Sequence, residues 1–130
     1  MTPVLYGFLA LTACSPAPAD LDAKAAPVTR SYAENYQEIY RRVSTTMKRC
    51  SSTSLGAYAS LVADSELYPD LGYGEISYSL LNWGVRNYYL TARIEKAPVG
   101  SKITVRAGNT VAPEQSVSTV LRWASGDQSC

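Results

Sequence analysis

The chain of 130 residues contains no histidine. Histidine is the usual general base at neutral pH, and the Ser-His-Asp and Cys-His arrangements of nucleophilic enzymes depend on it. Zinc sites that use histidine are excluded as well, and three cysteines are too few for a four-cysteine zinc site. The G-x-S-x-G motif of many hydrolases is also missing. The sequence therefore predicts no catalytic residue, no metal site and no cofactor.

Charge is scarce and balanced. Charged residues make up 18% of the chain, and 12 Lys and Arg against 11 Asp and Glu give a formal net charge of +1. Binding to nucleic acid needs a concentrated basic face that can neutralise phosphates. We therefore expect no nucleic-acid partner.

The sequence also has no apolar run long enough to cross a bilayer as a helix. The N-terminal run, residues 4–10, is short and suits the apolar region of a secretory signal. It is followed by Leu11-Thr12-Ala13-Cys14, which resembles a lipobox, the processing and lipidation site of bacterial lipoproteins. A secretory signal usually has Lys or Arg before its apolar run, and this run has neither. The alternatives are therefore that the signal starts further upstream or that the run is a buried N-terminal element of the fold.

The lipobox resemblance implies a type II signal peptide over residues 1–13, cleavage before Cys14 and acylation of that cysteine. The protein would then be held on membrane lipid through Cys14, in the cell envelope. Ser15, where Asp would favour inner-membrane retention, resembles the pattern of an outer-membrane lipoprotein that faces the periplasm.

Residues 15–30 contain three prolines and many alanines. Closely spaced prolines discourage regular helix and strand, so residues 14–30 are predicted to be a lipidated N-terminus and a flexible tether. The remaining residues, 31–130, are enough for one small domain.

Cys50 and Cys130 form an even pair once Cys14 is used for lipidation. In an oxidising compartment an even pair predicts a disulfide. The alternative is two free thiols.

Two amphipathic helices are expected. Residues 31–49 carry apolar residues at spacings of three and four, with Ser31 at the N-cap position and Glu34 three residues later, and residues 113–125 carry a second apolar stripe. The basic residues near the end of the first helix either complement its dipole or bind anionic lipid headgroups. Residues 57–63 are ambiguous, and a short helix or an irregular segment is expected there.

Three strands are predicted from period-two alternation, over residues 74–82, 86–96 and 102–107. Short connections between them indicate an antiparallel meander. The fold class is therefore predicted as α+β, in the order α-β-β-β-α, with both helices packed on one face of a three-stranded sheet. This order resembles the helix-grip domains of the outer-membrane lipoprotein BamC, and the resemblance implies a binding role by analogy.

Candidate partner contacts lie in two places. The segment 67–73 places Tyr68, Leu71 and Tyr73 among turn residues, either as an exposed recognition loop or as a loop held against the core. On the predicted polar face of the strand 86–96, Tyr89 and Arg93 are further candidates, although tyrosine is also common in ordinary strands.

We therefore expect a membrane-anchored, non-enzymatic interaction or accessory module with an envelope protein partner. The alternative is a carrier of a small ligand or glycan, with a pocket between the helices and the sheet. A hydrolase that uses two carboxylates from the acidic segment between residues 64 and 75 is a third possibility.

Overall fold

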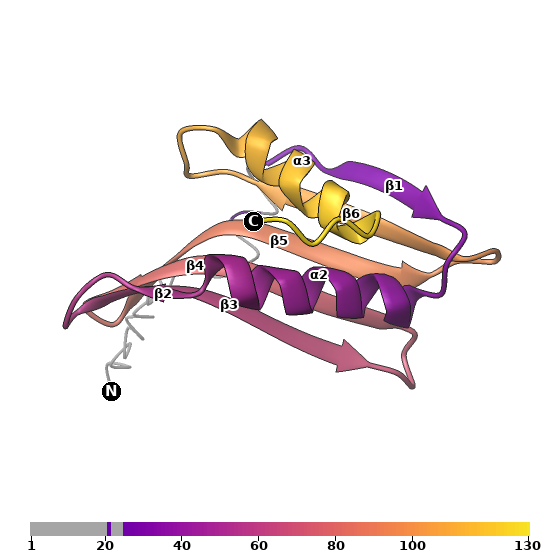
Figure 1. Ribbon diagram of the computed structural model, residues 1–130, viewed down its shortest axis with the longest axis horizontal. Helices are drawn as coiled ribbons and strands as arrows, with labels where there is room; N and C mark the ends of the chain where they lie inside the picture. The colour runs from indigo at the N-terminus through magenta and orange to yellow at the C-terminus, as the bar shows by residue number, and fades with distance from the viewer. Residues whose placement is uncertain (1–20, 22–24) are drawn as a thin grey trace, which may run out of the picture.

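The computed structural model describes Leu21 and residues 25–130. The elements follow the order β-α-β-β-β-β-β-α (Figure 1). They are β1 (Val28–Tyr32), α2 (Tyr36–Ser51), β2 (Thr53–Ser54), β3 (Ala59–Tyr68), β4 (Tyr73–Asn82), β5 (Val85–Lys96), β6 (Ser101–Ala107) and α3 (Pro113–Ala124).

The described strands form one six-stranded sheet in the order β1-β6-β5-β4-β3-β2, and every neighbouring pair is antiparallel. The prediction of a three-stranded meander in the order α-β-β-β-α is therefore wrong. The three predicted strands exist as β4, β5 and β6, but β3 and β2 extend the sheet on one side and β1 closes it on the other.

The first helix begins later than predicted because its expected first turn belongs to the sheet. Residues 28–32 pair with β6, and Ser31 lies opposite Lys102 rather than at a helix N-cap. The N-cap is Asn35, whose side-chain oxygen accepts a hydrogen bond from the backbone N–H of Gln37 at 2.8 Å. Three residues that had been assigned to the tether, 28–30, are thus part of β1.

The segment 57–63, for which a short helix or an irregular structure was expected, instead begins a strand of ten residues, β3. Its alanines suit a helix, but Ala63 and Leu67 pack against the core while Asp64 and Glu66 are exposed. This alternation continues across the acidic residues, where the sequence was interpreted as a loop, and the long ladder with β4 overrides local helix propensity.

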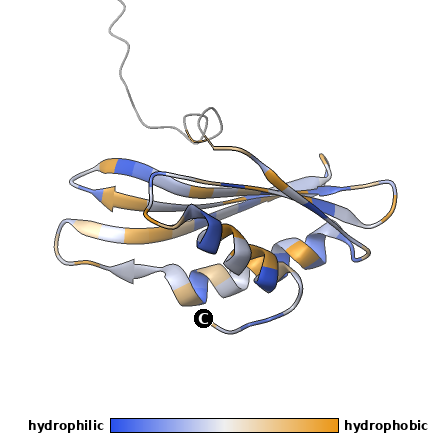
Figure 2. Ribbon diagram, turned by 90° about the horizontal axis from the view of Figure 1, so that it is seen from above, coloured by the Kyte–Doolittle hydropathy of each residue, from blue (hydrophilic) through white to orange (hydrophobic). Residues whose placement is uncertain are grey.

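Both helices lie on the same side of the sheet, as Figure 2 shows. The side chains between the two layers form a single apolar core, to which α2 contributes Tyr36, Ile39, Val43 and Met47. From the sheet and α3 the core includes Ile76, Leu90, Ala92, Ile94, Ile103, Val105, Val120, Leu121, Trp123 and Ala124. The opposite side of the sheet, called here the open face, is covered by neither helix.

Candidate interaction face

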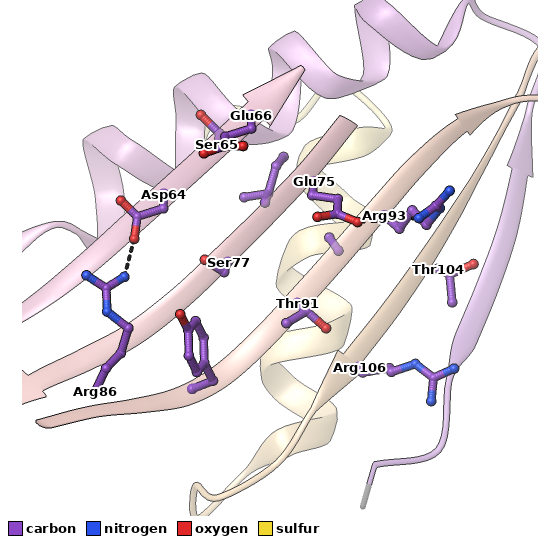
Figure 3. A pocket seen from close by; sticks show the side chains of 13 residues that line it. Asp64, Ser65, Glu66, Glu75, Ser77, Arg86, Thr91, Arg93, Thr104 and Arg106 are labelled. Carbon is purple, nitrogen blue, oxygen red and sulfur yellow. Dashed lines mark hydrogen bonds and ion pairs between the residues drawn. The ribbon is translucent and has the colours of Figure 1, made fainter. Parts of the chain in front are cut away.

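The open face carries a shallow hollow of about 570 Å³ across the four central strands β3, β4, β5 and β6. Figure 3 shows the polar side chains that line it, standing on the sheet with the helices behind. They are Asp64, Ser65, Glu66, Glu75, Ser77, Arg86, Tyr88, Thr91, Arg93, Thr104 and Arg106.

Opposite charges on this face are arranged in pairs. Two pairs join neighbouring strands, Arg93–Glu75 at 3.3 Å and Lys102–Glu95 at 3.2 Å, and such pairs support the register. Arg86 on β5 reaches Asp64 on β3 across β4, and within β5 Arg93 lies 4.0 Å from Glu95. Exposed ion pairs add little to stability, so these pairs matter mainly for the surface that they present to a partner.

Two tyrosines and an arginine meet at one end of the open face, and we call Tyr68, Tyr73 and Arg93 the tyrosine–arginine corner. The rings of Tyr68 and Tyr73 lie 5.0 Å apart, because the last residue of β3 pairs with the first residue of β4. The guanidinium carbon of Arg93 lies 3.9 Å from the centre of the Tyr73 ring, which is a cation–π contact. The sequence proposed all three residues as partner contacts, and the structure brings them together.

The hydroxyl of Tyr68 donates a hydrogen bond to the Glu66 carboxylate. This bond, followed by the loss of hydration around the phenol and the negative charge of Glu66, raises the pKa of Tyr68 from 10.0 to about 12. The hydrogen bond directs the Tyr68 hydroxyl toward Glu66 and so favours one orientation of the phenol.

Of the other two proposed contacts, Leu71 borders the corner and Tyr89 lies apart from it. Leu71 is exposed in the turn between β3 and β4, beside Tyr73 and the end of β5. The ring of Tyr89 lies 6.1 Å from that of Tyr78, which packs against the core on the helix side. The ladder between β4 and β5 shifts register at Tyr78 and Ser79, and Tyr88 instead of Tyr89 lines the open-face hollow.

Glu66 and Glu75 lie directly opposite each other on β3 and β4, which is the carboxylate pair that a hydrolase would require. Both are exposed to solvent; the Glu66 carboxylate accepts a hydrogen bond from the hydroxyl of Tyr68, and the Glu75 carboxylate accepts one from Arg93. A general acid at neutral pH needs an apolar environment that raises its pKa. This arrangement does not favour glycoside hydrolysis.

The space between the helices and the sheet is filled by the buried core side chains. The layer in which a carrier would hold its ligand is therefore occupied, and the hollow described above lies on the opposite face. Within Leu21 and residues 25–130, no three His, Cys, Asp or Glu side chains gather closely enough to hold a metal ion.

Cys50 and Cys130 are joined by a disulfide, with their Cα atoms 5.3 Å apart. The bond ties the last turn of α2 to the C-terminal tail, where a guanidinium nitrogen of Arg49 also donates to the carbonyl of Gln128. Cys14 lies outside the described residues. No helix in the described part of the chain has both the length and the apolar content needed to cross a bilayer.

Sequence reasoning missed several residues of the open face. Asp64 and Glu66 were taken as loop charges because β3 was not recognised, and Arg86 was not linked to Asp64 for the same reason. Tyr88 was missed because strict alternation puts it on the face opposite Tyr89 and Arg93, and a bulge that reverses the alternation leaves no clear signal in the sequence. Period-two alternation continued through residues 61–67 was the available clue to β3.

Comparisons with known proteins add the following. No protein-family model matches this chain, and no curated protein matches it. Among solved structures, the crystal structure of protein NE0264 from Nitrosomonas europaea is similar with a TM-score of 0.30 and 13% sequence identity, over 84% of this chain and 88% of that one.

Proposed function

We propose that this chain is a lipoprotein of the bacterial cell envelope, anchored through an acylated Cys14 and acting as a non-enzymatic interaction module. The proposed location and anchor rest on the lipobox-like Leu11-Thr12-Ala13-Cys14. The observation that carries the interaction role is the tyrosine–arginine corner on the open face.

Tyrosine and arginine are enriched at protein interfaces because both present a large apolar surface together with hydrogen-bond donors. In the corner the Arg93 guanidinium lies over the Tyr73 ring and the Tyr68 phenol is fixed by Glu66, so these groups are ordered before a partner arrives. Little side-chain entropy then remains to be lost on binding.

The rest of the open face favours a protein partner of mixed charge. Acidic and basic side chains alternate across the strands, so a complementary partner would exchange these exposed pairs for pairs across the interface. We place the partner in the periplasmic face of the outer membrane, where the acyl anchor would hold this domain.

The proposed membrane anchor is tested by the substitution Cys14→Ser in the native host. We expect the unsubstituted chain to fractionate with membranes and to carry acyl groups on Cys14 by mass spectrometry, and the variant to be released. An N-terminus that is unprocessed and free of acyl groups would refute the anchor.

The interaction face is tested by charge reversal at matched arginines. Arg93 on the open face and Arg122 on α3 have 47% and 45% of their side chains exposed, and each forms one or more exposed ion pairs. With a photo-crosslinking amino acid at position 73, Arg93→Glu should abolish the crosslinked envelope species while Arg122→Glu leaves it intact. Equal yields in both variants would place the interface elsewhere.

A further inference from the structure

Two aromatic rings are stacked in the open at the end of the molecule furthest from the tyrosine–arginine corner. Tyr58 precedes β3 and Trp83 lies in the turn between β4 and β5; their ring centres are 4.0 Å apart and their planes differ by 8°. The backbone N–H of Trp83 donates to the carbonyl of Tyr58 at 2.9 Å, so the two tips form one unit. Tyr58 is 62% exposed and Trp83 is 70% exposed.

The backbone at Trp83 is unfavourable for tryptophan. Asn82 and Val85 face each other across a two-residue turn in which Trp83 has φ +51° and Gly84 has φ +76°. Turns of this kind prefer Asn-Gly, because a side chain at positive φ meets the backbone. The stack on Tyr58 offsets part of this strain, but most of the Trp83 ring stays exposed to solvent, and that exposure requires another explanation.

The turn tips at the same end of the molecule carry no charge. Figure 1 places the β2–β3 and β4–β5 connections side by side, with the β6–α3 connection apart from them on the same side of the molecule. Residues 51–63, 76–85 and 107–113 contain no Asp, Glu, Lys or Arg, and the charged residues nearest to them along the chain are Arg49, Asp64, Glu75, Arg86, Arg106 and Glu114. The large apolar side chains exposed there, besides the stacked pair, are Leu55, Val85 and Val111. We call this region the uncharged end.

The chain also enters the domain at this end. Val28, the first residue of β1, pairs with Val105 near the end of β6, and the carbonyl of Ala25 accepts a hydrogen bond from Arg106. Leu21 is buried, and its Cδ1 atom lies 3.0 Å from the position that a Cβ atom on Gly108 would take. Gly108 in turn donates its N–H to the carbonyl of Tyr89, early in β5.

Cys14 precedes this fixed point by seven residues. Seven residues span at most about 25 Å even when fully extended. If Cys14 carries the acyl anchor of the proposed function, Leu21, where the chain enters the domain, stays within that distance of the bilayer surface.

We infer that the uncharged end is a second membrane contact, in which Trp83, Tyr58 and their aliphatic neighbours enter the interfacial region of a phospholipid bilayer. Tryptophan and tyrosine favour this region because their rings are apolar and their N–H and O–H groups still reach water or headgroups. Trp83 is the more exposed ring of the pair, and the lack of charge on the turn tips avoids the cost of desolvating ions.

A lipid surface fits this end better than a protein or a sugar does. A stable protein interface takes about 20–30 residues on each side, whereas two turn tips expose a handful of side chains. A sugar-binding platform needs polar side chains around a free ring face, whereas the hollow beside Tyr58 and Trp83 is lined mostly by small and apolar residues, with the Ser54 and Ser60 hydroxyls as its further polar side chains. A bilayer requires no matching shape.

The test uses the full chain with Cys14→Ser, so that no acyl group contributes, and vesicles of phosphatidylethanolamine and phosphatidylglycerol. The chain has two tryptophans, and Trp123 is buried in the core. The emission difference between this chain and its Trp83→Phe variant therefore reports Trp83 alone. We expect that emission to shift to the blue, to be shielded from an aqueous quencher, and to accompany flotation of the protein with the vesicles.

Two exposed valines provide a matched control. Val85 lies at the uncharged end and is 59% exposed, whereas Val99 lies in the β5–β6 turn at the other end and is 83% exposed. Val85→Ser should weaken vesicle partitioning and Val99→Ser should not. Trp83→Asn, which suits the positive φ and so retains the fold, should weaken partitioning by about tenfold.

Unchanged Trp83 emission with vesicles, or equal effects of the two valine variants, would overturn the proposal. A shift produced by a chitin oligosaccharide but not by vesicles would overturn it in favour of a sugar site. The tested chains carry no acyl group and share the same N-terminal residues, so the Trp83 emission and the comparison of Val85→Ser with Val99→Ser are separate from a failure of Cys14 acylation.

Discussion

At the scale of single residues, Tyr68 offers the clearest titration. Its pKa of about 12 exceeds the ordinary 10.0 because the phenol donates to Glu66, so the neutral phenol is favoured in the folded state. The stabilisation that this bond provides is complete below pH 10 and is lost as the pH rises through about 12.

We predict that Glu66→Ala lowers the pKa of Tyr68 toward its ordinary value. An alanine leaves neither a hydrogen-bond acceptor nor a negative charge beside the phenol. Tyrosinate absorbance as a function of pH, read as the difference from the same chain with Tyr68→Phe, measures the shift. Asp64→Ala is the control, since Asp64 lies on the same strand face but does not contribute to this pKa; an unchanged Tyr68 titration in Glu66→Ala would contradict the assignment.

The residue scale also shows where sequence reasoning about the site reached its limit. Tyr68, Tyr73 and Arg93 could be proposed from their types and positions, because two lie beside a turn and the third alternates with buried residues. Tyr89 could not be placed correctly, since one extra residue in β5 reverses which of two adjacent tyrosines reaches the open face.

At the scale of elements, α3 and the strands β4 to β6 follow from periodicity to within one residue at each end, because each contributes a continuous apolar face to the core. The edge strands do not. β1 was assigned partly to the tether and partly to the first turn of α2, because its residues alternate only weakly; none of them is buried. β1 is a strand because it pairs with β6, and this long-range pairing cannot be detected from the local pattern of its residues.

Two turn glycines allow a matched test of how the elements fit together. Gly84 and Gly100 have φ +76° and +69°, and any other residue there is strained. A Cβ atom on Gly84 would meet nothing within 4 Å, whereas one on Gly100 would lie 2.0 Å from the carbonyl oxygen of Tyr32 at the end of β1.

We therefore predict that Gly84→Ala lowers the free energy of unfolding by about 1–2 kcal/mol, the strain alone. Gly100→Ala should lower it by at least about 3 kcal/mol, because β1 must also move away from the β5–β6 turn. Urea unfolding followed by circular dichroism measures both values. Similar values for the two variants would show that the contact with Tyr32 relaxes without cost.

At the scale of the whole molecule, the disulfide closes a long loop. Its cysteines are 80 residues apart, so the bond encloses β2 to β6 and α3. Chain-entropy arithmetic for a loop of this length gives about 4–5 kcal/mol of stabilisation, comparable to the whole stability of a small domain.

We predict that Cys50→Ala combined with Cys130→Ala, in the chain that also carries Cys14→Ser, lowers the free energy of unfolding by several kcal/mol, up to about 4–5. The chain with Cys14→Ser alone should lose a similar amount when a reductant is added. Urea midpoints with and without reductant give the comparison. A loss below about 1 kcal/mol would mean that the unfolded chain gains little freedom when the bond is absent.

The placement of that covalent loop has a mechanical consequence. Among the described strands, β1 is the one that precedes Cys50, so it lies outside the closed loop and nearest the N-terminus. A pull transmitted from the N-terminal side loads the five-residue ladder between β1 and β6 before it reaches the other strands. Under tension β1 can thus detach from β6, which lengthens the connection between the N-terminal side and the domain. The rest of the sheet and α3 stay closed by the disulfide, which force of that kind does not break.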